Sequence, residues 1–264
     1  MSRIFFMISV FDSRQFNENL FFPRPDSIPG PPDCEEIYVE VEEKINVHCR
    51  RHPSPQARFS LLFFHGNGEV VSDYDDIVGA FAALGAETIV CDYRGYGKSG
   101  GAPSLRNALE DAKVIYRYLR DNGQLRSDVC VMGRSLGAAP AIELCSKFSE
   151  ISSCIIESGY ADPVPLVERR GLRIDQTTPE EDALFNNSLK IKKVQCPLLI
   201  MHGEDDFLIS PEEAKLNYSQ AGSKEKTLII LEGVGHNDMM MAENGGYFSG
   251  MKRFFESMSY YKHP

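Results

Sequence analysis

Short runs of mainly apolar residues alternate along the chain with longer stretches in which apolar residues recur every three or four positions. The first pattern is typical of strands buried on both faces of a sheet, and the second of helices that bury one face. The expected strands are Phe59–Phe64, Thr88–Tyr93, the run ending at Gly133, Cys154–Glu157, Pro197–His202 and Thr227–Glu232. The expected helices are Ser72–Leu84, a helix capped by Ser104, one ending near Phe148, Glu212–Gln220 and Tyr247–Ser257.

The stretch Glu36–Cys49 has a different pattern, because apolar and charged residues alternate in two runs around Glu42-Glu43-Lys44. This alternation predicts a half-exposed antiparallel hairpin at the edge of the sheet. Beyond the hairpin, strands separated by helices predict parallel pairing with right-handed crossovers. We therefore expect an α/β fold with a mostly parallel, eight-stranded sheet and helices on both faces.

A chain of 264 residues is long enough for one large α/β domain. We place this domain at residues 36–264, with a short cap insertion at about residues 158–195. Residues 1–35 are expected to form an N-terminal arm or linker, because Pro23–Asp33 contains five prolines. The apolar stretch Ile4–Phe11 is too short to span a bilayer. We expect it to be an initial strand or a surface-docking segment, and we expect no transmembrane segment.

The composition narrows the class of partner. A formal net charge of -10 argues against nucleic acid or an anionic membrane as the main partner, since both require a positive surface. Several of the seven cysteines lie inside apolar runs, which indicates buried thiols in a reducing, cytoplasmic setting. No pair of cysteines has zinc-binding spacing, and we expect neither a metal nor a cofactor.

The stretch Gly133-Arg134-Ser135-Leu136-Gly137 fits the G-x-S-x-G pattern, in which a sharp turn from strand to helix exposes a serine hydroxyl. The apolar run before it and the small residues after it provide the strand and helix that this motif requires. Ser135 is therefore the candidate nucleophile. A serine needs a base to remove its proton, and the base needs a carboxylate that orients it.

His236 is the candidate base, because it follows the last expected strand in a glycine-rich loop. His65 and His202 each end a buried strand, where a histidine has a structural role at least as often as a catalytic one, and His48, His52 and His263 lie near an edge or the terminus. For the acid, the strand ending at His202 is followed by three adjacent carboxylates, Glu204, Asp205 and Asp206. The order serine, acid, histidine is that of α/β-hydrolases.

An acyl-transfer site also needs two N–H donors for the oxyanion. The backbone N–H of Leu136, directly after the serine, is the first candidate. The second is the backbone N–H of Asn67 in the loop His65-Gly66-Asn67-Gly68, whose small residues leave the backbone open to a substrate.

Four stretches give the chain a resemblance to the α/β-hydrolase superfamily from about Glu36 to Ser257. They are FFHGNGE, DYRGYGKSGG, GRSLGAAPA, and HGEDDFLISP together with GVGHND. Among its members, the chain is similar to Bem46-like and depalmitoylase-like serine hydrolases, which act on esters and thioesters. The resemblance implies Ser135 as nucleophile, Asp206 as acid, His236 as base, and the amides of Asn67 and Leu136 as oxyanion hole.

The chain departs from the depalmitoylases because no cysteine precedes Cys34, so we do not expect the acylated cysteine cluster of those proteins. Arg169, Arg170 and Arg173 lie in the short cap, where they form either a solvated helix face or a contact for an anionic substrate group.

We expect a serine hydrolase that cleaves a small-molecule acyl ester or thioester through an acyl-enzyme. Two alternatives stay open: peptide cleavage or acyl transfer on the same triad, and a non-catalytic binding protein on a hydrolase fold. The sequence leaves the acyl group and the oligomeric state open.

Overall fold

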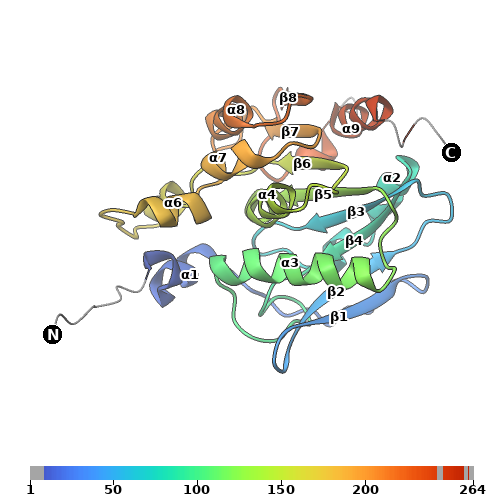
Figure 1. The fold of residues 1–264 in the computed structure, drawn as a ribbon, viewed down its shortest axis with the longest axis horizontal. Helices are drawn as coiled ribbons and strands as arrows, with labels where there is room; N and C mark the ends of the chain where they lie inside the picture. The colour runs from blue at the N-terminus through green and yellow to red at the C-terminus, as the bar shows by residue number, and fades with distance from the viewer. Residues whose placement is uncertain (1–8, 243–245, 259–260, 262–264) are drawn as a thin grey trace.

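The computed structural model describes residues 9–242, 246–258 and 261. The described strands form one sheet in the order β1-β2-β4-β3-β5-β6-β7-β8 (Figure 1). Neighbouring strands from β4 to β8 pair in parallel, whereas β2 is antiparallel to both β1 and β4. The strands are β1 (Glu35–Glu42), β2 (Ile45–His52), β3 (Phe59–Phe64), β4 (Ala86–Cys91), β5 (Val129–Arg134), β6 (Ser153–Glu157), β7 (Leu198–Gly203) and β8 (Lys226–Leu231). The expected fold, with its edge hairpin, is confirmed.

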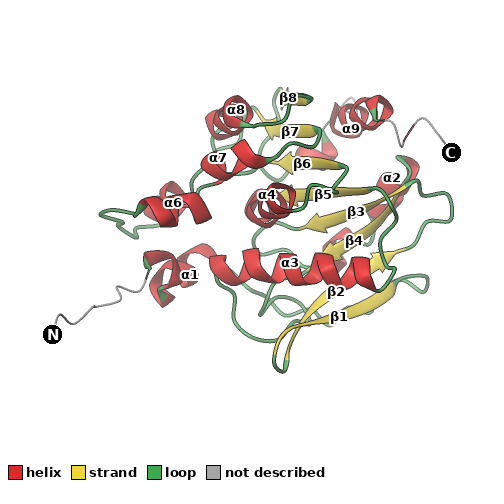
Figure 2. Cartoon of the chain, in the orientation of Figure 1, coloured by secondary structure: helices red, strands yellow, loops and turns green. Residues whose placement is uncertain are grey.

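Helices cover both faces of the sheet (Figure 2). The α-helices are α1 (Arg14–Leu20), α2 (Val78–Ala83), α3 (Leu105–Asp121), α4 (Ala138–Lys147), α5 (Pro163–Glu168), α6 (Pro179–Phe185), α7 (Asn187–Lys190), α8 (Pro211–Gln220) and α9 (Gly246–Ser257). The 3-10 turns are η1 (Val10–Asp12), η2 (Val71–Tyr74), η3 (Ser135–Gly137), η4 (Ile191–Lys193) and η5 (Met239–Met241). Because α5 to α7 and η4 lie between β6 and β7, they occupy the region where the sequence predicts a short cap.

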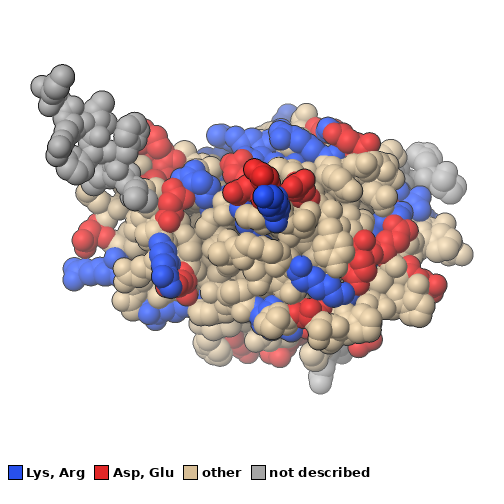
Figure 3. Space-filling model, turned by 90° about the horizontal axis from the view of Figure 1, so that it is seen from below, with Lys and Arg blue, Asp and Glu red and all other residues tan. Residues whose placement is uncertain are grey.

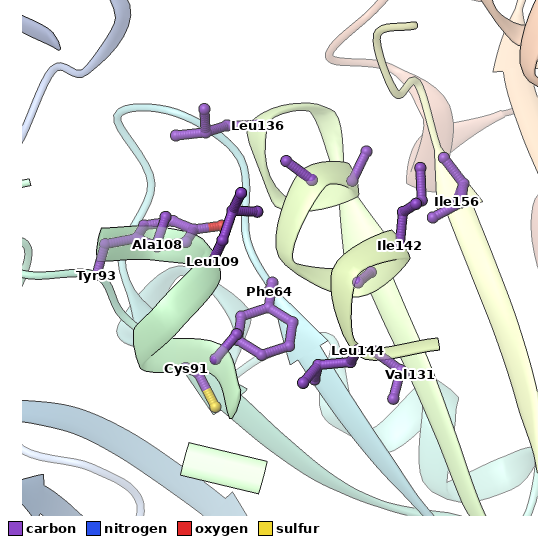
Figure 4. Close-up of a cluster of buried hydrophobic side chains, with 14 of the residues drawn as sticks. Phe64, Cys91, Tyr93, Ala108, Leu109, Val131, Leu136, Ile142, Leu144 and Ile156 are labelled. Carbon is purple, nitrogen blue, oxygen red and sulfur yellow. The ribbon is translucent and has the colours of Figure 1, made fainter. Parts of the chain in front are cut away.

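Strand β3 shows why the central strands are almost continuously apolar. Leu62 and Phe64 belong to the core cluster that includes α3 and α4, whereas Leu61 and Phe63 belong to the cluster that includes α2 and α9. Phe64 lies in Figure 4 close to Leu109 of α3. Since successive side chains of a strand point to opposite faces, burial of both faces leaves β3 with no position for a polar residue facing water.

Two helix predictions have different outcomes. The predicted cap at Ser104 is confirmed, since its side chain accepts a hydrogen bond from the backbone N–H of Asn107 at 3.1 Å. The continuous helix predicted over Ser72–Leu84 is wrong, because this stretch is divided into η2 and α2. Asp75 lies at the division, and its carboxylate accepts a hydrogen bond from Arg50 of β2 at 2.6 Å. That contact holds the segment between η2 and α2 against β2.

An ion cluster stabilises the edge hairpin around Glu36. Its carboxylate accepts hydrogen bonds from Arg50 at 2.9 Å and Lys98 at 3.0 Å, and it contacts the buried ring of His48. Partial burial acts to raise the pKa of Glu36, but the hydrogen bonds from these three side chains outweigh it and lower the pKa to about 2. The carboxylate is therefore charged throughout the neutral range.

The described part of the N-terminal region begins with a 3-10 turn. Ile4–Ile8 lie outside the described residues, while Val10 and Phe11 at the end of the apolar stretch form part of η1 and not a strand. After α1, residues 21–34 run without a helix, as the prolines predict. None of the helices in the described ranges is long and apolar enough to cross a membrane.

Charged side chains of both signs lie next to one another on the face seen in Figure 3, and the middle of that face is largely uncharged. Such mixing reduces the net field that a charged polymer would meet on this side of the molecule.

Candidate active site

The turn that carries Ser135 connects β5 to η3 and α4. Ser135 has a φ of 52°, a left-handed conformation that strains a residue with a Cβ atom and occurs mainly where the surrounding structure enforces it. Two glycines permit the tight turn. A Cβ atom on Gly133 would lie 2.1 Å from the carbonyl oxygen of Gly137, and one on Gly137 would lie 2.0 Å from that of Phe64. The turn therefore requires glycine at both positions.

The structure brings together the serine, histidine and acid that the sequence proposes. The Nε2 atom of His236 lies 3.0 Å from the Oγ of Ser135, and its Nδ1 lies 2.6 Å from Oδ2 of Asp206. Ser135 follows β5, Asp206 follows β7, and His236 follows β8. These strands run in parallel, so their carboxyl ends meet at one edge of the sheet.

Asp206 is the carboxylate of the acidic turn that contacts His236. Its Oδ1 accepts the backbone N–H groups of Leu208 at 2.9 Å and Ile209 at 2.8 Å, whereas Asp205 is exposed. Burial acts to raise the pKa of Asp206, but hydrogen bonds from His202, His236 and the Ile209 N–H hold it well below its usual range. Asp206 is thus an ionised, fixed partner for an imidazole.

The two candidate oxyanion donors lie at the same cavity as Ser135 and His236. Leu136 is the second residue of η3, and the first N–H groups of a helix have no partner within the helix. No hydrogen bond within the described part of the chain uses the backbone N–H of Asn67. The Asn67 side chain is engaged elsewhere, since its Nδ2 donates to the carbonyl oxygen of Leu20 at 2.6 Å. The backbone N–H groups, and not the amide side chain, are therefore the groups that can bind an oxyanion.

Arg134, the residue before the serine, connects two loops of the site and the end of β6. Its guanidinium donates to Glu69 at 2.9 Å, to Glu157 at 3.2 Å, to the carbonyl oxygen of His236 at 3.1 Å and to Oδ1 of Asn237 at 3.1 Å. Burial acts to raise the pKa of Glu69, but Arg134 leads the groups that hold it below its ordinary value. The sequence by itself indicates no role for Arg134 or Glu69. A charged residue at the end of an apolar strand is the signal that could have indicated a buried ion pair.

The cavity beside Ser135 has a volume of about 200 Å³. The apolar side chains that line it are Leu20, Phe22, Leu136, Leu166, Leu208 and Ile209. Leu20 and Phe22 precede the predicted domain, and no sequence signal marks them as part of a site.

The arginines of the cap have separate environments. Arg169 donates to the carbonyl oxygen of Leu208 at 2.7 Å and pairs with Glu213, while Arg173 is exposed and pairs with Asp175. Arg170 alone of these arginines lines the cavity.

The other buried histidines have structural partners. His65 lies 3.1 Å from Asp92 and 2.7 Å from the carbonyl oxygen of Gly66, and His202 lies 2.8 Å from that of Ile209. His263 falls outside the described residues. Over the ranges that the structure describes, there is no group of three or more His, Cys, Asp or Glu side chains that could hold a metal ion.

Comparisons with known proteins identify the family of the chain. The family model described as "Serine aminopeptidase, S33" matches residues 55–174 and 165–243. Protein bem46 of Schizosaccharomyces pombe is 28% identical over 243 residues, which cover 87% of this chain and 80% of that protein. Alpha/beta hydrolase domain-containing protein 17B of Homo sapiens is 30% identical over 209 residues, which cover 76% of this chain and 67% of that protein.

Among solved structures, the Pyrococcus furiosus esterase Pf2001 is similar to this chain, with a TM-score of 0.74 and 18% identity. The superposition covers 89% of this chain and 98% of the esterase chain. At this identity the likeness concerns the fold.

Proposed function

The chain belongs to the α/β-hydrolase family described as serine aminopeptidase S33, and from this premise we propose that it is a serine hydrolase acting on carboxylic esters or thioesters. The observation that carries the proposal is the pair of contacts of His236, with Ser135 Oγ at 3.0 Å and with Asp206 at 2.6 Å. This arrangement suits removal of the serine proton during attack on a carbonyl carbon.

In the proposed mechanism, the Oγ of Ser135 forms a bond to the acyl carbon as its proton passes to Nε2 of His236. The N–H groups of Leu136 and Asn67 stabilise the negative charge on the carbonyl oxygen of the tetrahedral intermediate. The bond to the leaving alcohol or thiol then breaks, and His236 returns the proton to it. A water molecule attacks the acyl-enzyme by the same steps in reverse, with His236 as base, and the carboxylic acid leaves.

The roles of the remaining groups follow from their charges. Asp206 is ionised and accepts from the Nδ1 side of His236, so it favours the tautomer whose Nε2 can accept a proton. It also stabilises the imidazolium that forms after the transfer. Arg134 is a positioning residue, because it contacts the backbone of His236 and not the reacting atoms.

We propose ester or thioester cleavage over removal of an amino-terminal residue from a peptide. A free amino group is bound most strongly by a carboxylate beside the serine that has no other donor. Glu69 is the carboxylate that lines the cavity, and it already accepts hydrogen bonds from Arg134 at 2.9 Å, the Gly66 N–H at 2.6 Å and the Tyr74 hydroxyl at 2.5 Å. A substrate amine would have to compete with all of these donors.

The test combines a fluorophosphonate probe with hydrolysis of p-nitrophenyl butyrate and of a butyryl thioester. Ser135→Ala should abolish labelling and reduce kcat by roughly 10⁶-fold. The matched control is Ser158→Ala, since Ser158 is also buried, directly follows the neighbouring strand β6 and has a positive φ of 47°. Unlabelled wild-type protein would favour the alternative of a non-catalytic binding protein. Labelling that survives in Ser135→Ala would place the nucleophile elsewhere.

We further propose that the protein works in the cytoplasm on a small-molecule substrate. The cysteines of the chain are free thiols, as expected in a reducing compartment. Fluorescence imaging of the tagged chain checks the location, and secretion of the chain would contradict it.

A further inference from the structure

The segment Ser9–Arg24, which we call the N-terminal strap, is packed firmly against the rest of the molecule. Phe11 stacks on Phe185 of the cap with ring centroids 4.4 Å apart. The Asn17 side chain donates to the carbonyl oxygen of Phe11 at 2.8 Å and accepts from the backbone N–H of Leu105 at 2.8 Å. In Figure 1, α1 lies beside α6 and the start of α3. The strap therefore has a defined position relative to the sheet.

The end of the strap holds the loop that carries the proposed oxyanion donor. The backbone N–H of Phe22 donates to Oδ1 of Asn67 at 2.9 Å, and Nδ2 of Asn67 donates to the carbonyl oxygen of Leu20 at 2.6 Å. Two residues further on, Arg24 donates to the carbonyl oxygen of Gly68 at 2.6 Å. These contacts hold the side chain of Asn67 and the carbonyl oxygen of the next residue, close to the Asn67 backbone N–H.

The strap also meets the cap over the cavity. The Arg170 guanidinium lies 4.7 Å from the centre of the Phe22 ring and donates to the carbonyl oxygen of Asn19 at 2.8 Å. Leu20 and Phe22 line the cavity, as does Leu166 of α5. The cavity is thus walled by the strap and the cap together, and its strap side chains are apolar.

The cavity volume limits what can fit beside Ser135. A methylene group needs about as much space as a water molecule, whose share of the liquid is roughly 30 Å³, so about 200 Å³ accommodates roughly seven such groups. A longer acyl chain would have to extend past the side chains of the strap and the cap.

We infer that Leu20 and Phe22 determine the acyl specificity of the hydrolase: they close the acyl pocket, so that its substrates are esters or thioesters of short to medium-length acyl groups. This inference rests on the proposed function. Leu20 is almost fully buried and forms the inner part of the cavity wall, whereas Phe22 is 49% exposed and forms the outer part. Shortening either side chain opens space that a longer chain can fill.

The experiment measures kcat/KM of the wild type, Phe22→Ala and Leu20→Ala with p-nitrophenyl esters from acetate to laurate. The wild type should lose activity beyond octanoate. In each alanine variant the optimum should move to longer chains. For every added methylene that reaches new apolar surface, kcat/KM should rise about fourfold, which is equivalent to about 0.8 kcal/mol. Phe22→Trp should move the optimum to shorter chains. All substitutions of Phe22 keep the backbone N–H that holds Asn67.

The matched control is Tyr118→Ala, because Tyr118 is an aromatic residue of similar exposure, 40%, on α3 and does not line the cavity. Its chain-length profile should equal that of the wild type. Leu20→Ala could fail to fold, but Phe22 is half exposed and its variants keep the inference testable. If the Phe22 variants keep the wild-type chain-length profile and their activity still depends on Ser135, the inference about acyl specificity is wrong while the proposed function stands. Wild-type protein without such activity would overturn the proposed function as well.

Discussion

Replacing Arg134 by lysine keeps a positive charge beside Ser135 but removes the fork of donors that joins the loops of the site. In the wild type, the guanidinium reaches Glu69, Glu157, the His236 carbonyl oxygen and the Asn237 side chain. A lysine ammonium carries its donors on one nitrogen, so it cannot span the same set of acceptors. We expect it to stay with the two carboxylates and to release the loop that carries the histidine.

The magnitude follows from the two hydrogen bonds to that loop, each 3.1 Å long. A protein hydrogen bond contributes about 0.5–1.5 kcal/mol net, so loss of both costs about 1–3 kcal/mol. Because the loop sets the position of His236 relative to Ser135, we expect this cost to appear in the transition state. At about 1.4 kcal/mol for each factor of ten, kcat/KM should fall roughly 10- to 100-fold.

Arg94→Lys is the matched control. Arg94 is as buried as Arg134, with exposed fractions of 7% and 6%, and it pairs through two hydrogen bonds with Asp111 at 2.7 and 2.8 Å. It lines no part of the cavity beside Ser135. We expect this variant to lose about as much unfolding free energy as Arg134→Lys while keeping wild-type kcat/KM.

The assay pairs urea unfolding with hydrolysis of one p-nitrophenyl ester for all three proteins. The positioning role of Arg134 is refuted if Arg134→Lys keeps kcat/KM within about twofold of the wild type while losing stability. This role is also refuted if Arg94→Lys loses as much activity as Arg134→Lys, because replacing any buried arginine would then have the same effect.

Asp206→Asn should reduce kcat by about 10⁴-fold, since an amide in place of the carboxylate favours the wrong tautomer of the triad histidine. Asp205→Asn, next to it and exposed, should stay within about twofold, and equal losses in both variants would contradict the assignment. Glu36→Gln tests pH dependence by urea unfolding. The folded pKa of about 2 lies below the ordinary value near 4.3, so the contribution of Glu36 is present above that value and is lost as pH falls towards 2. The stability gap between wild type and variant, about 1 kcal/mol after allowance for solvent exposure, should therefore close on acidification, and a gap that widens would refute this. Gly137→Ala should lose activity and stability together, because its Cβ would lie 2.0 Å from the Phe64 carbonyl oxygen, and a variant with normal thermal unfolding and kcat would show that the turn tolerates a side chain.

The sequence alone determined the order of the elements and the kind of site. Continuous apolar runs predict buried parallel strands because both of their faces must leave water, and β3 to β7 follow that pattern, whereas β8 at the sheet edge is only partly buried. The glycines around Ser135 predict a tight turn because a Cβ atom has no room there. Parallel strands bring their carboxyl ends to one edge, so the sequence order of Ser135, an acidic turn and His236 already indicated one site.

The tertiary structure decided which side chains of these loops meet. The pattern of three adjacent carboxylates does not distinguish Asp205 from Asp206, because the choice depends on which one the turn directs towards His236. Ser135 and His236 are 101 residues apart, and Leu20 and Asn67 are 47 apart. Contacts at such separations leave no periodic signal in the chain, since each depends on how two loops pack and not on the spacing within either one. The role of the N-terminal strap as a wall of the cavity is a property of the packed molecule, whereas the nucleophile turn is already present in its own five residues.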